Sequence, residues 1–105
     1  IELDALPILP GVAALIAQGY YTRANATNRK GIESSMRIEG DPDPVDVDLV
    51  FDPQTSGGLL VSIAAARADA FGAACQQAGA ESTAVIGEVR KRFAKSQDPF
   101  LILRG

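Results

Sequence analysis

The sequence predicts an α+β domain in which a mixed sheet carries helices packed on one of its faces. Helical periodicity appears near the start of the chain and over residues 64–79, whereas apolar runs typical of strands occupy residues 59–63, 83–89 and 100–103. The 105 residues are 47% hydrophobic and 22% charged, a composition typical of an ordered globular chain. We therefore expect one domain over residues 1–105.

The first helix is predicted over residues 10–18. Pro10 suits the first helical turn, where the missing N–H has no partner in any case, and Gly19 suits the left-handed position that ends a helix. One apolar face is formed by Val12, Leu15 and Ile16. Residues 20–42 match neither the helical nor the strand period well, so we expect mostly loop there.

Residues 43–53 permit two interpretations. Apolar side chains alternate with acidic ones, which favours a strand. Against this, Asp43 is a good N-cap, Pro44 a good first helical residue, and Asp46 stands where the acid of a capping box would stand. We favour a short helix that ends before Pro53.

The second half of the chain reads as strand, helix, strand, strand. Residues 59–63 have the composition of a buried strand. The helix over residues 64–79 presents one small-residue face and stops at a glycine, and we expect Cys75, beside that face, to be a small buried hydrophobe. In the strand over residues 83–89, Gly87 indicates a bulge or the close approach of another backbone.

Composition excludes several classes of protein. The net charge of −3 provides no basic footprint for nucleic acid. One cysteine and no histidine exclude an internal disulfide, a tight zinc site and Ser–His or Cys–His nucleophiles. No apolar run approaches the ~20 residues that span a bilayer, so we expect a cytoplasmic protein with no membrane partner. Because Ile1 and its neighbours read like the middle of a fold, we expect a piece of a larger protein.

Each of three charged segments is either a solvated surface or a functional contact. The basic loop over residues 20–30 is either a solvated surface or an anion-facing loop. Six acidic residues lie between Glu39 and Asp52, but their spacing is not that of an EF-hand, so we expect solvated acids and no metal site. Arg90, Lys91, Arg92 and Lys95 form a basic patch, which is either a solvated turn or a contact for phosphate.

Residues 52–60, which read Asp-Pro-Gln-Thr-Ser-Gly-Gly-Leu-Leu, are the most unusual stretch. The paired glycines let backbone N–H groups approach an anion with no Cβ in the way, and the two hydroxyls before them are further donors. The stretch is no Walker A loop, because no lysine follows the glycines and the strand comes after the loop. The residues alone leave a phosphate-contacting loop and a tight structural turn both open.

The same nine residues resemble the signature near the C-terminus of the selenophosphate synthetases (selenide, water dikinases). Residues 6–11 and 16–19 resemble the family's upstream segment, and the helix with residues 85–89 resembles its downstream helix and strand. The loop after Gly19 departs from the family: its frequent Pro-Gly-Gly-Thr is replaced by Thr22-Arg23-Ala24-Asn25, and only Asn28 keeps its match.

The resemblance implies an enzyme that converts ATP, selenide and water to selenophosphate, AMP and phosphate with the help of Mg²⁺. It implies two α/β domains of the aminoimidazole ribonucleotide synthetase-like kind, of which the N-terminal one supplies the nucleotide loop, the metal ligands, the catalytic lysine and the cysteine or selenocysteine. None of those motifs is present here. We therefore expect part of the C-terminal domain, with no catalytic or metal-binding residue of its own and no activity alone.

The resemblance also implies the binding residues and the partners. The residues expected to line or brace the nucleotide cleft are Gln54, Thr55, Ser56, Gly57 and Gly58. Asn28, together with Arg29, is expected to face phosphate. The expected partners are the missing N-terminal ATP-binding domain, ATP and selenide, and a second copy in a homodimer of the full-length enzyme.

Two other classes of function stay open on the sequence. One is a small α+β interaction or regulatory module in which the glycine loop is only a turn. The other is a related enzyme, such as thiamine-monophosphate kinase or a hydrogenase maturation factor. The intact run from Gln54 to Gly58 favours the synthetase among the enzymes.

Overall fold

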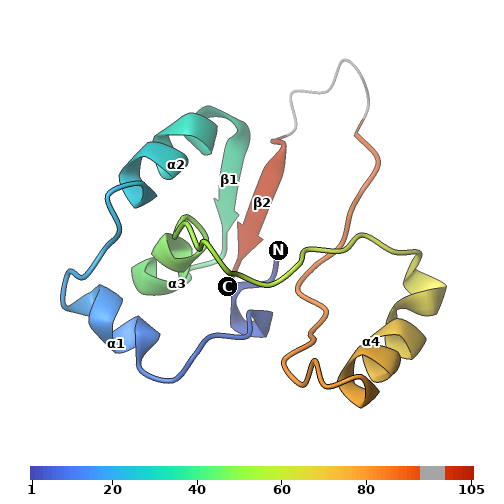
Figure 1. Cartoon of the computed structure of the whole chain (residues 1–105). Helices are drawn as coiled ribbons and strands as arrows, with labels where there is room; N and C mark the ends of the chain where they lie inside the picture. The colour runs from blue at the N-terminus through green and yellow to red at the C-terminus, as the bar shows by residue number, and fades with distance from the viewer. Residues whose placement is uncertain (93–98) are drawn as a thin grey trace.

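A computed structural model describes residues 1–92 and 99–105 of the chain. Four α-helices and two strands are labelled in Figure 1, and three single-turn 3₁₀ helices accompany them. The α-helices are α1 (Val12–Ala17), α2 (Asn25–Ile32), α3 (Pro44–Leu49) and α4 (Ala68–Gln77). The strands are β1 (Met36–Glu39) and β2 (Leu101–Arg104), and the 3₁₀ turns span Leu3–Ala5, Glu33–Ser35 and Ala65–Arg67. The α+β class predicted from the sequence is confirmed.

The centre of the fold is the pair of strands, which run parallel with Met36 opposite Leu101 and Glu39 opposite Arg104. The N-terminal segment continues this pairing on the other edge of β2: the Ile1 amine donates to the Ile102 carbonyl at 2.8 Å, and the Arg104 N–H donates to the Ile1 carbonyl at 2.9 Å. Segments from both ends of the chain and from its middle therefore lie side by side.

The buried core is small and lies between the strands and α3. Leu3, Val47, Phe51 and Leu103 form it, and Leu3 and Leu103 are almost completely enclosed. Helices α1, α2 and α3 gather on one side of the strands, whereas α4 lies apart on the other side (Figure 1). In the described ranges, no helix has the length and apolar content needed to cross a bilayer.

Two helices form where local sequence signals predicted them. α1 ends before Gly19, which adopts the left-handed φ of +87°. α3 begins after Asp43, whose carboxylate accepts from the Val45 N–H at 2.9 Å, and it ends well before Pro53. The helical interpretation of residues 43–53 is thus confirmed over the strand.

Residues 20–42 are more ordered than the loop expected there. They contain α2, one 3₁₀ turn and β1. The sequence of α2 has little apolar periodicity, and the helix is held by side-chain amides that reach α3 and by Ile32, which packs against the core. A pattern search for apolar faces misses such a helix because its stabilising contacts are polar.

The strands predicted over residues 59–63 and 83–89 are wrong for this structure. Leu59 and Leu60 expose 94% and 79% of their surface, and no ladder forms. Of residues 83–89, only Ile86 makes a sheet-like contact, accepting from the Glu2 N–H at 2.9 Å. The expected close approach at Gly87 is confirmed, because a Cβ there would lie 3.0 Å from the Ile1 Cα.

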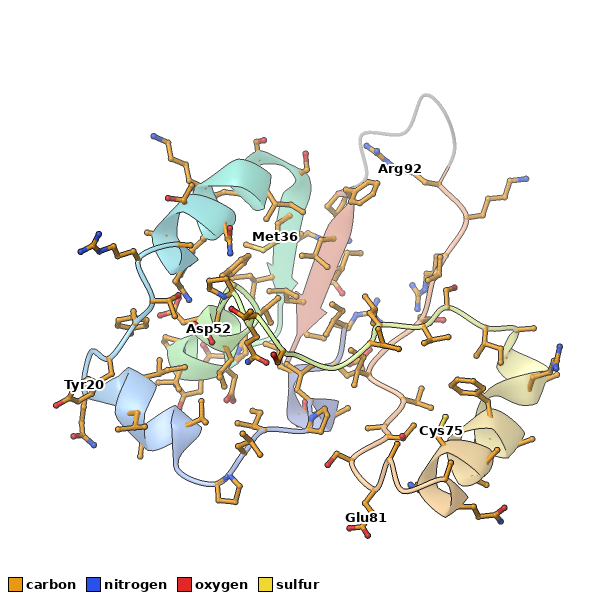
Figure 2. The ribbon with its side chains drawn as sticks, viewed as in Figure 1. Tyr20, Met36, Asp52, Cys75, Glu81 and Arg92 are labelled. Carbon is orange, nitrogen blue, oxygen red and sulfur yellow. The ribbon has the colours of Figure 1, made fainter. Side chains whose placement is uncertain are left out.

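Helix α4 forms as predicted, but its apolar face has no core to cover. None of its residues is buried, and it packs mainly on the 3₁₀ turn that precedes it. Cys75 is only partly enclosed, so the expectation of a buried core cysteine is wrong. Figure 2 shows Cys75 on α4, far from Met36 in the helix–sheet core.

Candidate functional site

The glycine loop over residues 54–58 lies on the surface, on the long passage from α3 to α4 (Figure 1). Thr55 and Ser56 form a turn that brings Gly57 back over Gln54, so that a Cβ at position 57 would lie 3.2 Å from the Gln54 Cβ. The Gly58 N–H has no hydrogen bond in the described residues, and a Cβ at position 58 would meet nothing within 4 Å. The loop therefore offers open space and a free donor.

An apolar hollow of about 410 Å³ lies behind the loop. Gln54, Gly58 and Leu60 line it together with the N-terminal segment, the end of α3 and Ile86, and Gln54 bears the only polar side chain among the lining residues. A phosphate deep in this hollow would meet mainly apolar side chains, at a high free-energy cost. We therefore expect an anion to meet the loop at its exposed rim, beside Gln54 and Gly58.

Two asparagines of α2 fix the chain that leads into the loop. The Asn25 amide nitrogen donates to the Asp48 carbonyl at 2.8 Å, and the Asn28 amide nitrogen donates to the Phe51 carbonyl at 3.0 Å. The two acceptors belong to the C-terminal end of α3 and to the turn after it, and the Asp48 carbonyl also accepts from the Phe51 N–H at 3.1 Å. Asn28 thus touches the chain three residues before Gln54, and its phosphate contact stays a prediction.

The Asp48 carboxylate ties α3 to α2 and to the loop before it. One oxygen accepts from the Arg29 guanidinium at 2.8 Å and the other from the Tyr21 hydroxyl at 3.3 Å. The Arg29 guanidinium also lies 5.8 Å from the centre of the Phe51 ring. Burial, and then the negative charge of Asp48, raise the pKa of Tyr21 above its ordinary value. Arg29 is therefore engaged by a carboxylate.

Sequence reasoning missed most of this polar cluster, although the signal was present. Asn25, Asn28 and Arg29 stand at positions i, i+3 and i+4, which places them on one face of a helix. The expectation of a loop over residues 20–42 hid that spacing. Asp48 and Asp52 are among the acids expected to be solvated, whereas each has a hydrogen-bond partner in the structure.

The charged segments provide no ion site in the part of the chain that the structure describes. No three Asp, Glu, Cys or His side chains gather there closely enough to hold a metal ion. In the basic patch, Arg90 pairs with Glu88, and Lys95 lies outside the described residues. These residues do not fit a Mg²⁺ site, which requires several oxygen ligands around one ion.

Known proteins resemble this chain over most of its length. No family model matches it, and no solved structure gives a significant match. Relatives named selenide, water dikinase do match: that of Burkholderia ambifaria (strain MC40-6) is 40% identical over 89 residues, and that of Nitratidesulfovibrio vulgaris (strain DSM 19637 / Miyazaki F) is 33% identical over 91 residues.

The chain is homologous to part of the selenide, water dikinases. The matches cover 85% and 87% of the chain but only 25% and 26% of those two relatives. A third selenide, water dikinase, from Caldanaerobacter subterraneus subsp. tengcongensis, is 35% identical over 68 residues, which is 20% of its length. The chain thus spans about a quarter of the dikinases it matches, consistent with the C-terminal domain portion predicted from the glycine signature.

Proposed function

We propose that this chain is the C-terminal part of a selenophosphate synthetase, which makes selenophosphate, AMP and phosphate from selenide, ATP and water. The observation that carries the proposal is the similarity to selenide, water dikinases over 85% of the chain. In this proposal the chain closes over or braces the nucleotide cleft and has no activity alone.

The glycine loop is the part proposed to meet the nucleotide phosphates. The free Gly58 N–H and the exposed loop residues Thr55 and Ser56 supply donors without a competing internal bond. Asn28 braces the loop indirectly, because it fixes the Phe51 carbonyl just upstream. The open space at Gly58 leaves room for a phosphate oxygen to approach the backbone.

Part of the chain's positive charge is already used in ion pairs within the chain. Phosphoryl transfer requires positive charge around the transferred group. Four arginines are already paired with carboxylates: Arg29, Arg37, Arg90 and Arg104. ATP and Mg²⁺ would therefore be held mainly by the proposed N-terminal ATP-binding domain, and no step of the reaction is assigned to a metal in this chain.

The large exposed surface of the chain supports the proposal that a partner covers part of it. Its accessible area is 8188 Å², whereas a folded monomer of 11.0 kDa exposes roughly 5,600 Å². Large apolar residues such as Leu59, Val85 and Val89 are among the exposed ones. We propose that the N-terminal domain of the same enzyme covers part of it, within a homodimer of the full-length chain.

A chimeric enzyme tests the proposal. The matching quarter of the Burkholderia ambifaria dikinase is replaced by this chain, and selenide-dependent formation of AMP from ATP is measured. We expect activity in the chimera and none above blank with the chain alone. A chimera that melts cooperatively but forms no AMP would contradict the proposal, and so would turnover by the isolated chain.

The loop is tested in that chimera with Gly58→Ala. A Cβ fits at position 58 without contact, so folding should be unchanged. The added methyl group keeps the N–H but fills the space through which a phosphate oxygen would approach it, so activity should fall at least about tenfold. Gly72→Ala in α4 is the matched control, because it also adds a methyl group in open space. Equal activity of the two variants would show that the loop does not contact the phosphates.

A further inference from the structure

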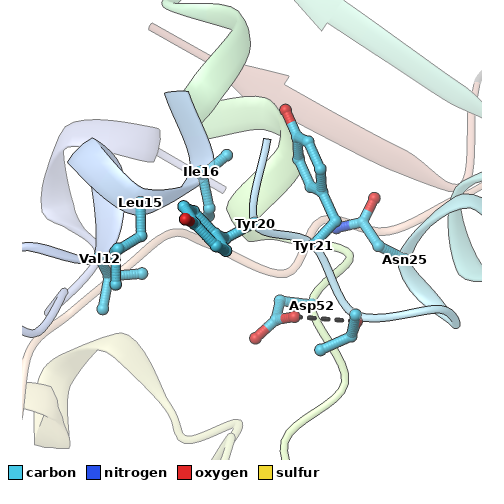
Figure 3. A pocket seen from close by; sticks show the side chains of 8 residues that line it. Val12, Leu15, Ile16, Tyr20, Tyr21, Asn25 and Asp52 are labelled. Atoms are coloured by element: carbon cyan, nitrogen blue, oxygen red, sulfur yellow. Dashed lines mark hydrogen bonds between the residues drawn. The ribbon is translucent and has the colours of Figure 1, made fainter. Parts of the chain in front are cut away.

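A second pocket, of about 290 Å³, lies between α1, the start of α2 and Asp52 (Figure 3). Val12, Leu15 and Ile16 of α1 form its aliphatic wall, the Tyr20 ring lies beside Ile16, and Tyr21 and Asn25 stand farther from α1. Its volume is at the lower end of the range for small-molecule sites. Leu15, Tyr20 and Tyr21 in its lining stay exposed, so the pocket is an open hollow that can hold a single-ring compound against the surface.

The charge of this pocket is negative. Asp52 is the only charged residue that lines it. One Asp52 oxygen accepts from the Thr22 hydroxyl at 3.1 Å, and the other has no hydrogen bond in the described residues. The nearby Arg29 does not compensate, because its guanidinium is bound to Asp48. An anion would be repelled here, whereas a cation would gain a carboxylate partner.

Asn25 supplies a further acceptor in the wall. Asn25 is 94% enclosed, and its amide nitrogen is used by the Asp48 carbonyl. Its amide oxygen makes no hydrogen bond in the part of the chain that the structure describes, and the side chain lines the pocket. Because no fully buried side-chain N or O atom among the described residues lacks a partner, this oxygen is open to solvent, where a ligand N–H group can reach it.

We infer that this pocket binds a small planar organic cation, such as an amidinium or guanidinium carried on a compact apolar body. The flat cation would donate to Asp52 in the paired geometry that carboxylates form with such groups, and the Tyr20 ring would contact its face. The apolar body would lie against the α1 wall. This site is separate from the glycine loop and takes the opposite charge to phosphate.

Benzamidine and benzoate test the inference, because they share a flat ring and nearly the same shape but carry opposite charges. The chain has two tyrosines and no tryptophan, and both tyrosines line the pocket. Tyrosine ring signals in NMR spectra therefore report on binding at this pocket. We expect saturable shifts with benzamidine and none with benzoate, whereas equal responses or no tyrosine shift with benzamidine would overturn the inference.

Variants separate the pocket from nonspecific attraction. Asp52→Asn should weaken benzamidine binding about tenfold by removing the charge-assisted contact, and Tyr20→Leu should weaken it about threefold by removing the ring face. Asp41→Asn is the charge-matched control, because Asp41 is exposed and lines no part of the pocket. An equal loss in the Asp41 and Asp52 variants would overturn the inference. The assay contains no ATP or selenide, so its failure is distinct from failure of the proposed enzyme function.

Discussion

Two asparagines that differ in burial do the same chemical task in this protein. Asn25 and Asn28 each donate an amide N–H to a carbonyl at the end of α3, at 2.8 and 3.0 Å. Asn25 is 6% exposed, whereas Asn28 is exposed. A carbonyl that loses a buried donor cannot recover the bond with water, but an exposed one can. Loss of the Asn25 amide should therefore lower the stability of the protein more than loss of the Asn28 amide.

The first prediction follows from this difference. Asn25→Ala should lower the free energy of unfolding by about 1–3 kcal/mol, because it leaves the Asp48 carbonyl with fewer partners. Asn28→Ala, the matched control, should lower it by about 0.5–1 kcal/mol. Urea denaturation of both variants measures the two values, and an equal or reversed order would show that α2 is not anchored through Asn25.

At the scale of elements, the strands are joined by ion pairs as well as by the ladder. Arg104 of β2 donates to Glu39 of β1 at 2.9 Å and to Glu2 of the N-terminal segment at 3.3 Å. Arg37 contacts the other oxygen of Glu39 at 2.6 Å. Hydrogen bonds from Arg104, and then from Arg37, lower the pKa of Glu39 below its ordinary value.

The second prediction concerns acid. A carboxyl group whose pKa is lowered by folding stabilises the folded state above its unfolded pKa, and this contribution is lost as the pH falls through the lowered folded value. We expect the melting temperature to fall as the pH drops below the ordinary glutamate pKa of 4.5, and Glu39→Gln should make that fall shallower.

Glu33→Gln is the control for the acid experiment, because Glu33 makes no ion pair among the residues described. It should leave the slope of melting temperature against pH unchanged. An identical slope in the Glu39 variant and the parent chain would mean that the strand pairs contribute nothing to acid stability. Many exposed ion pairs contribute nothing measurable to the free energy of unfolding.

At the scale of the whole molecule, the chain is open. Its radius of gyration is 15.1 Å, against about 13 Å for a compact domain of this length. Helix α4 has no buried residue, and residues 53–63 make no hydrogen bond in the described structure. The aligned 89 residues make up only 25% of the Burkholderia ambifaria relative, and the open surfaces are places where the remaining chain of the proposed enzyme would pack.

The third prediction concerns residues 58–63, which form no strand in the structure although their composition predicted one over residues 59–63. In the isolated chain, amide hydrogens of residues 58–63 should exchange nearly as fast as in an unfolded peptide, because none of them is hydrogen-bonded. Amides of β2 are the internal control and should be protected. Hydrogen exchange with mass spectrometry measures both. Strong protection of residues 58–63 would show that these residues form a strand after all.

In the chimera, the same amides should gain protection if they pair with the added chain. A sheet edge left unpaired is also a template for self-association. The isolated chain should therefore elute earlier in gel filtration as its concentration rises, and the chimera should not.

The sequence by itself determined the features whose causes are local. The cap at Asp43 begins α3, the glycines at 19 and 79 end α1 and α4, and the glycine signature led to the selenide, water dikinases. Each depends on a few neighbouring residues whose backbone preferences and hydrogen bonds act over a single turn.

Only the tertiary structure decided which apolar runs become strands and which polar residues meet. Residues 59–63 and 101–104 look alike in composition, but only the latter find a partner strand, since pairing depends on residues far away in the chain. Likewise, Asn25 and Asp48 are separated by 23 residues and come together only because α2 folds against α3. Contacts across such separations cost loop-closure entropy and are set by the whole fold rather than by local propensity.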